Sequence, residues 1–287
     1  MNTAVAARQG RWHQSTISAI LDGCSWQYFL TYIAGLDPGI KPHASIGTAY
    51  HAAVELSELA RKHGLQRKEK LMLEHAAEEL HKVTDEPEYH AMLQACVKNY
   101  WAHIRPYLEQ YEPVALEPEF TLNLVEGAKP IGGYIDGIYR DPTDGQLFII
   151  DHKTVGNFSR WRNADSHRHQ AAMYSVALVL SEDFPEITEL PEMRYLLVRT
   201  SQGTRSNFEP SRILTVQPDL EDVRILGDRI RQAESVVRNA TFEKKTSWPL
   251  CSPKWCAFYE RCVLGSELSG TVEQVLSISV GSRTTQS

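Results

Sequence analysis

Four cysteines at opposite ends of the chain constrain its fold more than any other feature of the sequence. Cys24 lies near the start of the 287-residue chain, and Cys251, Cys256 and Cys262 lie near its end. Iron–sulfur clusters and structural zinc ions both commonly take four protein ligands, so three clustered thiols require a fourth. If Cys24 is that ligand, a metal site holds the two ends of the chain together.

The remaining composition indicates an intracellular globular protein. The chain has neither a signal-peptide hydrophobic segment nor a run of about 18 apolar residues, so we expect a cytoplasmic protein without membrane contact. In a reducing compartment, cysteines favour metal binding over disulfides. The fifth cysteine, Cys96, lies in a helical pattern, and we expect it to be a small buried side chain.

The charge of the chain is a weak guide to its partners. The net charge of −6 argues slightly against nucleic acid, but the distribution of charge matters more. Residues 158–169 contain Arg160, Arg162 and Arg168 together with two aromatic residues. Guanidinium groups bind phosphates with two hydrogen bonds and aromatic rings stack on unpaired bases, so this segment suits DNA. By itself, it is equally well explained as a solvated loop before a helix.

Helical periodicity dominates the first part of the chain, and strand-like alternation follows it. We expect helices over residues 15–33, 46–62, 68–82, 88–111, 165–181 and 218–239. We expect strands over residues 114–125, 130–140, 146–154, 192–199 and 211–216. This order indicates an α/β fold with a mixed sheet flanked by helices. Residues 1–265 are interpreted as a single domain, and residues 266–287 as a flexible tail.

The most definite local prediction is a β-hairpin. Asp141–Gly145 has a proline at an early position and a glycine at its end, which is a strong turn signal. The strands over residues 130–140 and 146–154 should therefore pair with each other. Asp136 is expected on the first of these strands, among three glycines that leave room for close approach to the backbone.

The second strand of the hairpin carries an acid and a lysine. Alternation along a strand places Asp151 and Lys153 on one face and His152 on the other. Carboxylates on neighbouring strands can share a hard divalent cation such as Mg²⁺. On the following helix, Gln170 and Tyr174 share a face, since they are four residues apart. Taken alone, Asp-X-Lys is more often an ordinary surface pair.

In this order, the segments resemble the PD-(D/E)XK nuclease superfamily. They are most similar to its RecB-like branch with iron–sulfur clusters, which includes CRISPR-adaptation and phage exonucleases. The resemblance lies in Ser15–Cys24, Gly47–His51, Gly133–Asp136, Ile149–Thr154, Gln170–Tyr174 and the three late cysteines. It implies a restriction-endonuclease-like mixed sheet, a helical N-terminal part and a C-terminal cysteine-rich segment.

The resemblance also assigns roles to individual residues. It implies that His51, Asp136 and Asp151 bind metal, with the backbone carbonyl of His152 as a further ligand. Lys153 would position or activate the attacking water. Gln170 and Tyr174 would lie near the substrate and the active site. An acidic position before the hairpin in some members matches Glu117 or Glu119.

The implied activity is hydrolysis of DNA phosphodiester bonds with Mg²⁺ or Mn²⁺, by an exonuclease acting on free ends or single strands. By analogy, the process would be DNA recombination or another form of DNA processing. A [4Fe–4S] cluster would be held by Cys24, Cys251, Cys256 and Cys262, with zinc as the rival metal. The alternatives are a non-catalytic DNA- or partner-binding module with the same fold, and an enzyme acting on another phosphoester.

Two details depart from the family pattern. Ile135 precedes Asp136 where the family usually has proline, a variation that the RecB-like branch allows. The late cysteines are spaced Cys-X4-Cys-X5-Cys rather than with the tighter Cys-X2-Cys.

Overall fold

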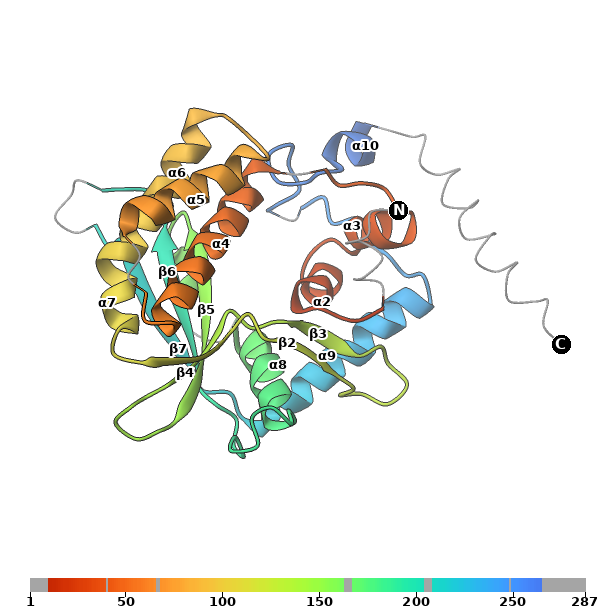
Figure 1. The fold of residues 1–287 in the computed structure, drawn as a ribbon. Coiled ribbons are helices and arrows are strands. Elements are labelled where there is room, and N and C mark those ends of the chain that lie inside the picture. Colours follow the sequence, from red (N-terminus) through yellow and green to blue (C-terminus); the bar gives the residue numbers. More distant parts are fainter. Residues whose placement is uncertain are drawn as a thin grey trace. The chain divides into compact units, whose positions relative to one another are not determined.

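The computed structural model describes residues 10–39, 41–65, 68–162, 167–203, 208–247 and 249–264 (Figure 1). The predicted tail over residues 266–287 lies outside the described residues. The chain divides into two compact units, which we describe separately. The sheet unit comprises residues 42–124 and 131–228, and the cysteine unit comprises residues 1–41, 125–130 and 229–287. That residues 1–265 form one nuclease domain stays a prediction.

The sheet unit is built on the mixed sheet that the sequence predicts. Its five strands lie in the order β1-β4-β5-β6-β7. They are β1 (Glu112–Leu116), β4 (Gly137–Arg140), β5 (Leu147–Val155), β6 (Met193–Arg199) and β7 (Ser211–Val216). Strands β5 and β6 pair in parallel, and the other neighbours pair antiparallel. Helix α8 (Arg168–Val179) lies on the crossover that a parallel pair requires.

Different helices contact the two faces of this sheet. Helices α4 (Pro42–Lys62), α5 (Glu69–His81) and α6 (Pro87–Asn99) share one core with Phe148 and Ile150 of β5 (Figure 1). Ile149 of β5 belongs instead to a second core with residues of α8. The alternation of side chains along β5 therefore decides which residues meet which helices.

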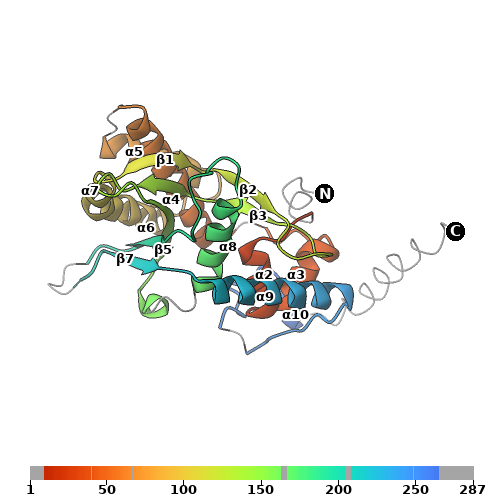
Figure 2. The same cartoon turned by 90° about the horizontal axis from the view of Figure 1, so that it is seen from below.

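The predicted strands over residues 114–125 and 130–140 are each broken in two. After β1, the chain forms β2 (Glu119–Leu122), which pairs with β3 (Ile131–Tyr134) in a separate two-stranded sheet. Figure 2 shows β2 and β3 side by side. The hairpin is confirmed for β4 and β5 only, closed by the hydrogen bond from Asp141 N to Gln146 O of 2.9 Å. Asp136 lies in the break between β3 and β4, so its predicted place within a hairpin strand is wrong.

Two predicted helices are also interrupted. The helix expected over residues 15–33 consists of α2 (Gln14–Leu21), α3 (Ser25–Tyr28) and a π-helix (Phe29–Ile33). Cys24 has an extended backbone, with φ −102° and ψ 100°, and this ends the helical path between α2 and α3. The helix expected over residues 88–111 consists of α6, a π-helix (Tyr100–Ile104) and α7 (Arg105–Leu108).

The cysteine unit brings early and late parts of the chain into contact. Phe29 and Leu30 pack with Phe258, which precedes α10 (Tyr259–Leu264). Trp26 N donates to Glu243 O at 3.1 Å, and Glu243 N donates to Ser25 Oγ at 2.7 Å. These contacts hold the segment containing Cys24 against the segment that leads to the late cysteines.

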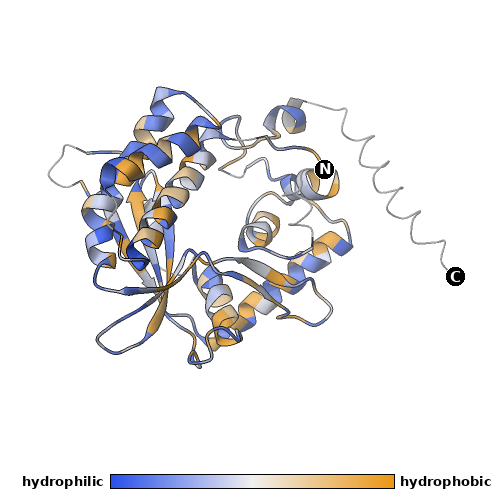
Figure 3. Ribbon diagram, viewed as in Figure 1, coloured by the Kyte–Doolittle hydropathy of each residue, from blue (hydrophilic) through white to orange (hydrophobic). Residues whose placement is uncertain are grey.

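Helix α9 (Leu220–Arg238) continues from the sheet unit into the cysteine unit. Both hydrophobic and hydrophilic residues occur in each part of this helix, as expected of an amphipathic helix (Figure 3). Within the described part of the chain, no helix has both the length and the apolar character needed to cross a membrane.

Candidate active site

The break between β3 and β4 gives the Asp136 side chain a position that a strand residue would not have. Ile149 N of β5 donates to Glu192 O, on the side of β6, at 2.8 Å. By alternation, His152 N faces the side of β4. Strand β4 begins only at Gly137 and does not extend this far along β5. In its place, the Asp136 carboxylate accepts a hydrogen bond from His152 N at 2.6 Å. A side-chain carboxylate thus replaces a backbone carbonyl at the edge of the hairpin.

Asp151 and Lys153 share the face of β5 that the sequence predicts. The Asp151 carboxylate is 1% exposed and forms an ion pair with the Lys153 ammonium group. From α8, Gln170 Nε2 donates to Asp151 Oδ1 at 2.9 Å. The same Gln170 group lies 3.2 Å from Tyr174 Oη. The four residues therefore form one connected set, in which α8 holds the orientation of Asp151.

His51 of α4 approaches the same place from the helical layer. Its Nδ1 atom lies 3.3 Å from Asp136 Oδ2. His51, Glu117 and Asp136 each offer a ligand atom, and these atoms all lie within 4.8 Å of one another. Two carboxylates and an imidazole are a suitable donor set for Mn²⁺, and the carboxylates also suit Mg²⁺. These side chains therefore fit a divalent cation.

Glu117 joins this group through an unusual backbone conformation. It follows β1 and has a φ of 48°, in the left-handed region that few non-glycine residues adopt. The backbone N of Glu117 donates a hydrogen bond to Asp136 O at 3.3 Å. This bond holds Glu117 next to the break between β3 and β4. The sequence left Glu117 and Glu119 as alternatives. The structure places Glu117 in the group, whereas Glu119 lies on β2 opposite Tyr134.

The pKa values of the three carboxyl groups depend on burial and on the charged groups around them. Burial raises the pKa of Asp151 to about 6, against the opposing effect of Lys153. Burial, and then the negative charge of Asp136, raise the pKa of Glu117 to about 7. Although burial acts to raise it, the pKa of Asp136 lies well below its usual range because His51 is close to it. A bound cation would stabilise all three carboxylates in their charged form.

His152 has a different position from the other predicted ligands. Its ring lies on the opposite face of β5, with its centroid 6.1 Å from that of Tyr50 and 6.0 Å from that of Tyr100. Burial lowers its pKa to about 4, so the ring is neutral at pH 7. The side chain is part of the helical core. A role for its backbone carbonyl as a metal ligand remains a prediction from the resemblance.

A buried carboxylate network supports the site and was not anticipated from the sequence. Glu58 of α4 is 1% exposed and accepts hydrogen bonds from Tyr100 Oη at 2.7 Å and Tyr139 Oη at 2.9 Å. Arg61 forms an ion pair with the same carboxylate, with an N–O distance of 2.6 Å. Because Glu58 and His51 are both on α4, this network fixes the helix that presents His51. Their spacing of seven residues, two helical turns, was the available signal.

Removing this carboxylate should strongly destabilise the protein. We expect Glu58→Ala to lower the free energy of unfolding by about 3–5 kcal/mol, because a partly buried guanidinium and two buried hydroxyl groups lose their partner. Urea unfolding followed by circular dichroism measures the change. Glu74 on α5 is 52% exposed at its side chain, so Glu74→Ala is a matched control with little expected effect. Equal stability of the two variants would contradict a structural role for Glu58.

The three arginines proposed for DNA differ in their surroundings. Arg168 Nε donates to Asp222 Oδ1 at 2.8 Å, and its Nη2 lies 3.1 Å from Asp219 Oδ2. Its guanidinium therefore ties the start of α8 to the start of α9. Arg162 is exposed, just after the short 3-10 helix Ser159–Trp161. The Arg160 side chain lies outside the described part of the structure.

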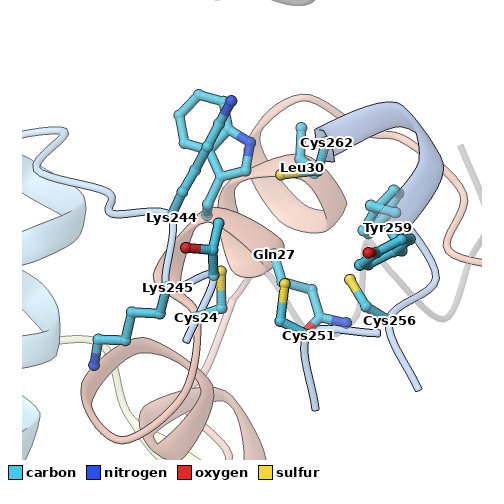
Figure 4. A pocket seen from close by; sticks show the side chains of 12 residues that line it. Cys24, Gln27, Leu30, Lys244, Lys245, Cys251, Cys256, Tyr259 and Cys262 are labelled. Atoms are coloured by element: carbon cyan, nitrogen blue, oxygen red, sulfur yellow. The ribbon is translucent and has the colours of Figure 1, made fainter. Parts of the chain in front are cut away.

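All four cysteines of the predicted ligand set line one cavity in the cysteine unit. Cys24, Cys251, Cys256 and Cys262 surround it, with Lys244 and Lys245 beside them (Figure 4). Each of the four is a free, partly exposed thiol. Burial raises the pKa of Cys256 and Cys262, and the neighbouring thiols raise both further. Four sulfur donors that repel one another as thiolates suit a bound metal centre.

Cys96 should behave unlike the other four thiols. It is 0% exposed on α6, and burial raises its pKa to about 12. Because the thiolate is the reactive form, we expect native metal-depleted protein to react with Ellman's reagent at four cysteines, and unfolded protein at five. The Cys96→Ala variant identifies the slow thiol. A fast reaction of Cys96 in the native protein would contradict its buried position.

The fold and these side chains together define a class of protein. A mixed sheet carries a carboxylate and a lysine on a central strand, with a second carboxylate at the end of the hairpin and an imidazole on a covering helix. A model of the PD-(D/E)XK nuclease superfamily matches residues 14–263. The chain belongs to the PD-(D/E)XK nuclease superfamily, and its fold is of the restriction-endonuclease-like kind.

Solved structures that match the chain include one from the comparison with individual proteins. The crystal structure of SSO0001 matches 85% of this chain and 93% of its own chain, at 12% sequence identity and a TM-score of 0.35. No match is found among curated protein sequences.

Proposed function

We propose that the chain is a DNA nuclease that depends on Mg²⁺ or Mn²⁺ and digests DNA from its ends. The observation that carries this proposal is the convergence of His51, Glu117 and Asp136 within 4.8 Å, next to the ion pair between the buried Asp151 and the partly exposed Lys153. Superfamily membership supports hydrolysis of phosphodiester bonds in general. DNA recombination or processing is the proposed setting.

The metal would be held by the carboxylates of Asp136 and Asp151 and by His51, with Glu117 as an additional ligand. When bound, it would neutralise the phosphodiester charge and lower the pKa of a bound water. The two oxygen atoms of Asp151 are contacted by Lys153 and Gln170. Gln170 thus keeps one Asp151 oxygen in a fixed direction.

Lys153 would orient a water molecule and stabilise negative charge, and it would not act as a base that removes a proton. Burial alone would lower its pKa, but Asp151 and Asp136 raise it above the usual value, so the ammonium group stays charged. A charged ammonium group can hold a water molecule by donation and can stabilise negative charge on a phosphoryl oxygen. This supports a positioning and electrostatic role for Lys153.

DNA contact would involve the segment that follows β5. Arg162 is exposed there, and we assign Arg160 and Arg162 to phosphate contacts. The Trp161 ring stacks on His167, with centroids 3.7 Å apart and an interplanar angle of 9°. For Arg168 we favour a structural role, because its guanidinium pairs with Asp219 and Asp222. Single-stranded DNA is the proposed substrate form, since aromatic side chains stack on unpaired bases.

The cysteine cavity would hold a [4Fe–4S] cluster. Two points support this proposal: the four thiols line one cavity, and the sequence resembles the iron–sulfur branch of the superfamily. In such a cluster, each sulfur ligand binds a separate iron atom. A brown colour with absorption near 400 nm tests this assignment, and stoichiometric zinc would oppose it.

The activity is tested with end-labelled linear DNA and closed circular DNA, each with Mg²⁺ or Mn²⁺. We expect the linear form to be digested to short products and the circular form to persist. Nicking of the circular form would make the protein an endonuclease. If neither form is cut but DNA is bound, the alternative of a non-catalytic binding module holds. Digestion of RNA or a free nucleotide instead of DNA would change the substrate class.

A further inference from the structure

Two histidines and an aspartate meet at the connection between α5 and α6, in a group separate from the one around Asp136. His81 is the last residue of α5, Asp85 lies in the connection, and His90 lies in the first turns of α6. Each offers a ligand atom, and the three atoms all lie within 4.8 Å of one another. The proposed nuclease mechanism uses none of these residues.

The backbone holds these three residues in place. Leu80 and Leu93 are buried in the core of the sheet unit, so both helices are fixed next to the connection. Thr84 N donates to Leu80 O at 3.0 Å, and His90 N donates to Glu86 O at 3.4 Å. The side chains therefore project from a short, hydrogen-bonded turn between two packed helices. A site on such a support loses little conformational entropy when an ion binds.

The side chains already face one another. His81 Nδ1 is in direct contact with Asp85 Oδ1, and the centroids of the His81 and His90 rings lie 5.1 Å apart at an angle of 67°. His90 Nε2 lies 3.0 Å from Thr84 O. A backbone carbonyl beside a histidine ring restricts its orientation, as is usual for metal-binding histidines.

We propose that His81, Asp85 and His90 bind a divalent transition-metal ion of the Zn²⁺ type. Two imidazoles and one carboxylate are donors for Zn²⁺, Co²⁺ or Ni²⁺, whereas Mg²⁺ and Ca²⁺ take oxygen ligands. The side chains of His81 and Asp85 are 63% and 79% exposed, so an ion has direct access and water completes its coordination. The bound ion holds the end of α5 to the first turns of α6.

The test is calorimetric titration of Zn²⁺ into the full chain with its cysteine centre loaded and with excess Mg²⁺ at the nuclease centre. Wild-type protein should bind one more equivalent of Zn²⁺ than the double variant His81→Gln/His90→Gln, or bind it at least tenfold more tightly. The matched control is His63→Gln, since His63 is an exposed histidine just after α4. It should bind Zn²⁺ as the wild type does.

Two further readouts locate the ion. Zn²⁺ should raise the thermal midpoint of the wild type but not of the double variant, and it should slow hydrogen exchange around residues 80–90. DNA digestion with Mg²⁺ should be the same in both proteins, so the outcome is independent of the proposed nuclease activity. Equal Zn²⁺ stoichiometry and affinity in the wild type and double variant would overturn the proposal, as would an equal loss in His63→Gln.

Discussion

Replacing Lys153 by alanine should reduce DNA digestion by about 10³-fold with little change in DNA affinity. The lysine contacts Asp151 and no other described side chain by an ion pair, so its loss removes one positive charge from the centre of the site. A donor that stabilises developing charge in a dry site contributes on the order of 10²–10³ in kcat. The loss should therefore appear in kcat rather than in KM. End-labelled DNA with saturating Mg²⁺ or Mn²⁺ provides the measurement.

Two other variants separate catalysis from folding. Lys98→Ala removes an exposed lysine of α6 and should leave digestion unchanged. Asp151→Asn keeps the shape of the carboxylate but removes its charge, so we expect digestion to fall at least as far as in Lys153→Ala. Circular dichroism confirms that each variant is folded. Unchanged digestion by both Lys153→Ala and Asp151→Asn would contradict the assignment of this group as the active site.

Replacing Cys24 by alanine should remove the proposed metal centre of the cysteine unit and destabilise that unit. The four thiols line one cavity, and Cys24 is the only one of them from the early part of the chain. A cross-link that closes a loop of this length restricts the unfolded chain, which corresponds to about 5 kcal/mol in the loop-entropy treatment of disulfides. We expect loss of iron, loss of absorption near 400 nm and a lower unfolding midpoint.

The matched control is Cys96→Ala, which removes a thiol outside the cavity. It should retain the iron content of the wild type and lose only the small stabilisation of a buried sulfur. Full iron content in Cys24→Ala would show that Cys24 is not a ligand. Zinc in place of iron in the wild type would leave the ligand assignment intact but overturn the proposed cluster.

Several features of the site follow from local rules and could be predicted. The Asp141–Gly145 turn depends on neighbouring residues alone, and it aligns β4 with β5. Alternation along β5 puts Asp151 and Lys153 on the same face of the strand. Helical spacing puts Gln170 and Tyr174 on the same face of α8. These residues do meet, with Gln170 bonded to both Asp151 and Tyr174. Short-range geometry of strands and helices was sufficient for each of these predictions.

Other features depend on contacts between distant residues. The sequence predicts one continuous strand over residues 130–140, but β3 pairs with β2 and β4 with β5, so the strand breaks at Asp136. The break allows the Asp136 carboxylate to reach His152 N and brings Glu117 beside it. Alternation alone does not reveal a change of partner strand, because residues on both sides of the break keep the same pattern.

The sequence by itself therefore determined the class of fold, the turn and the chemistry of the central strand, because these depend on periodicity and residue type. Only the tertiary structure decided which polar side chains form ion pairs and hydrogen bonds with side chains of other helices and strands. Arg168 pairs with Asp222, and Glu58 is satisfied by two tyrosines and Arg61. Apart from the pair Glu58 and Arg61 within α4, these partners lie more than 40 residues apart in the chain. Burial makes such partnerships obligatory, since an unpaired buried charge is too costly, but packing alone selects the partner.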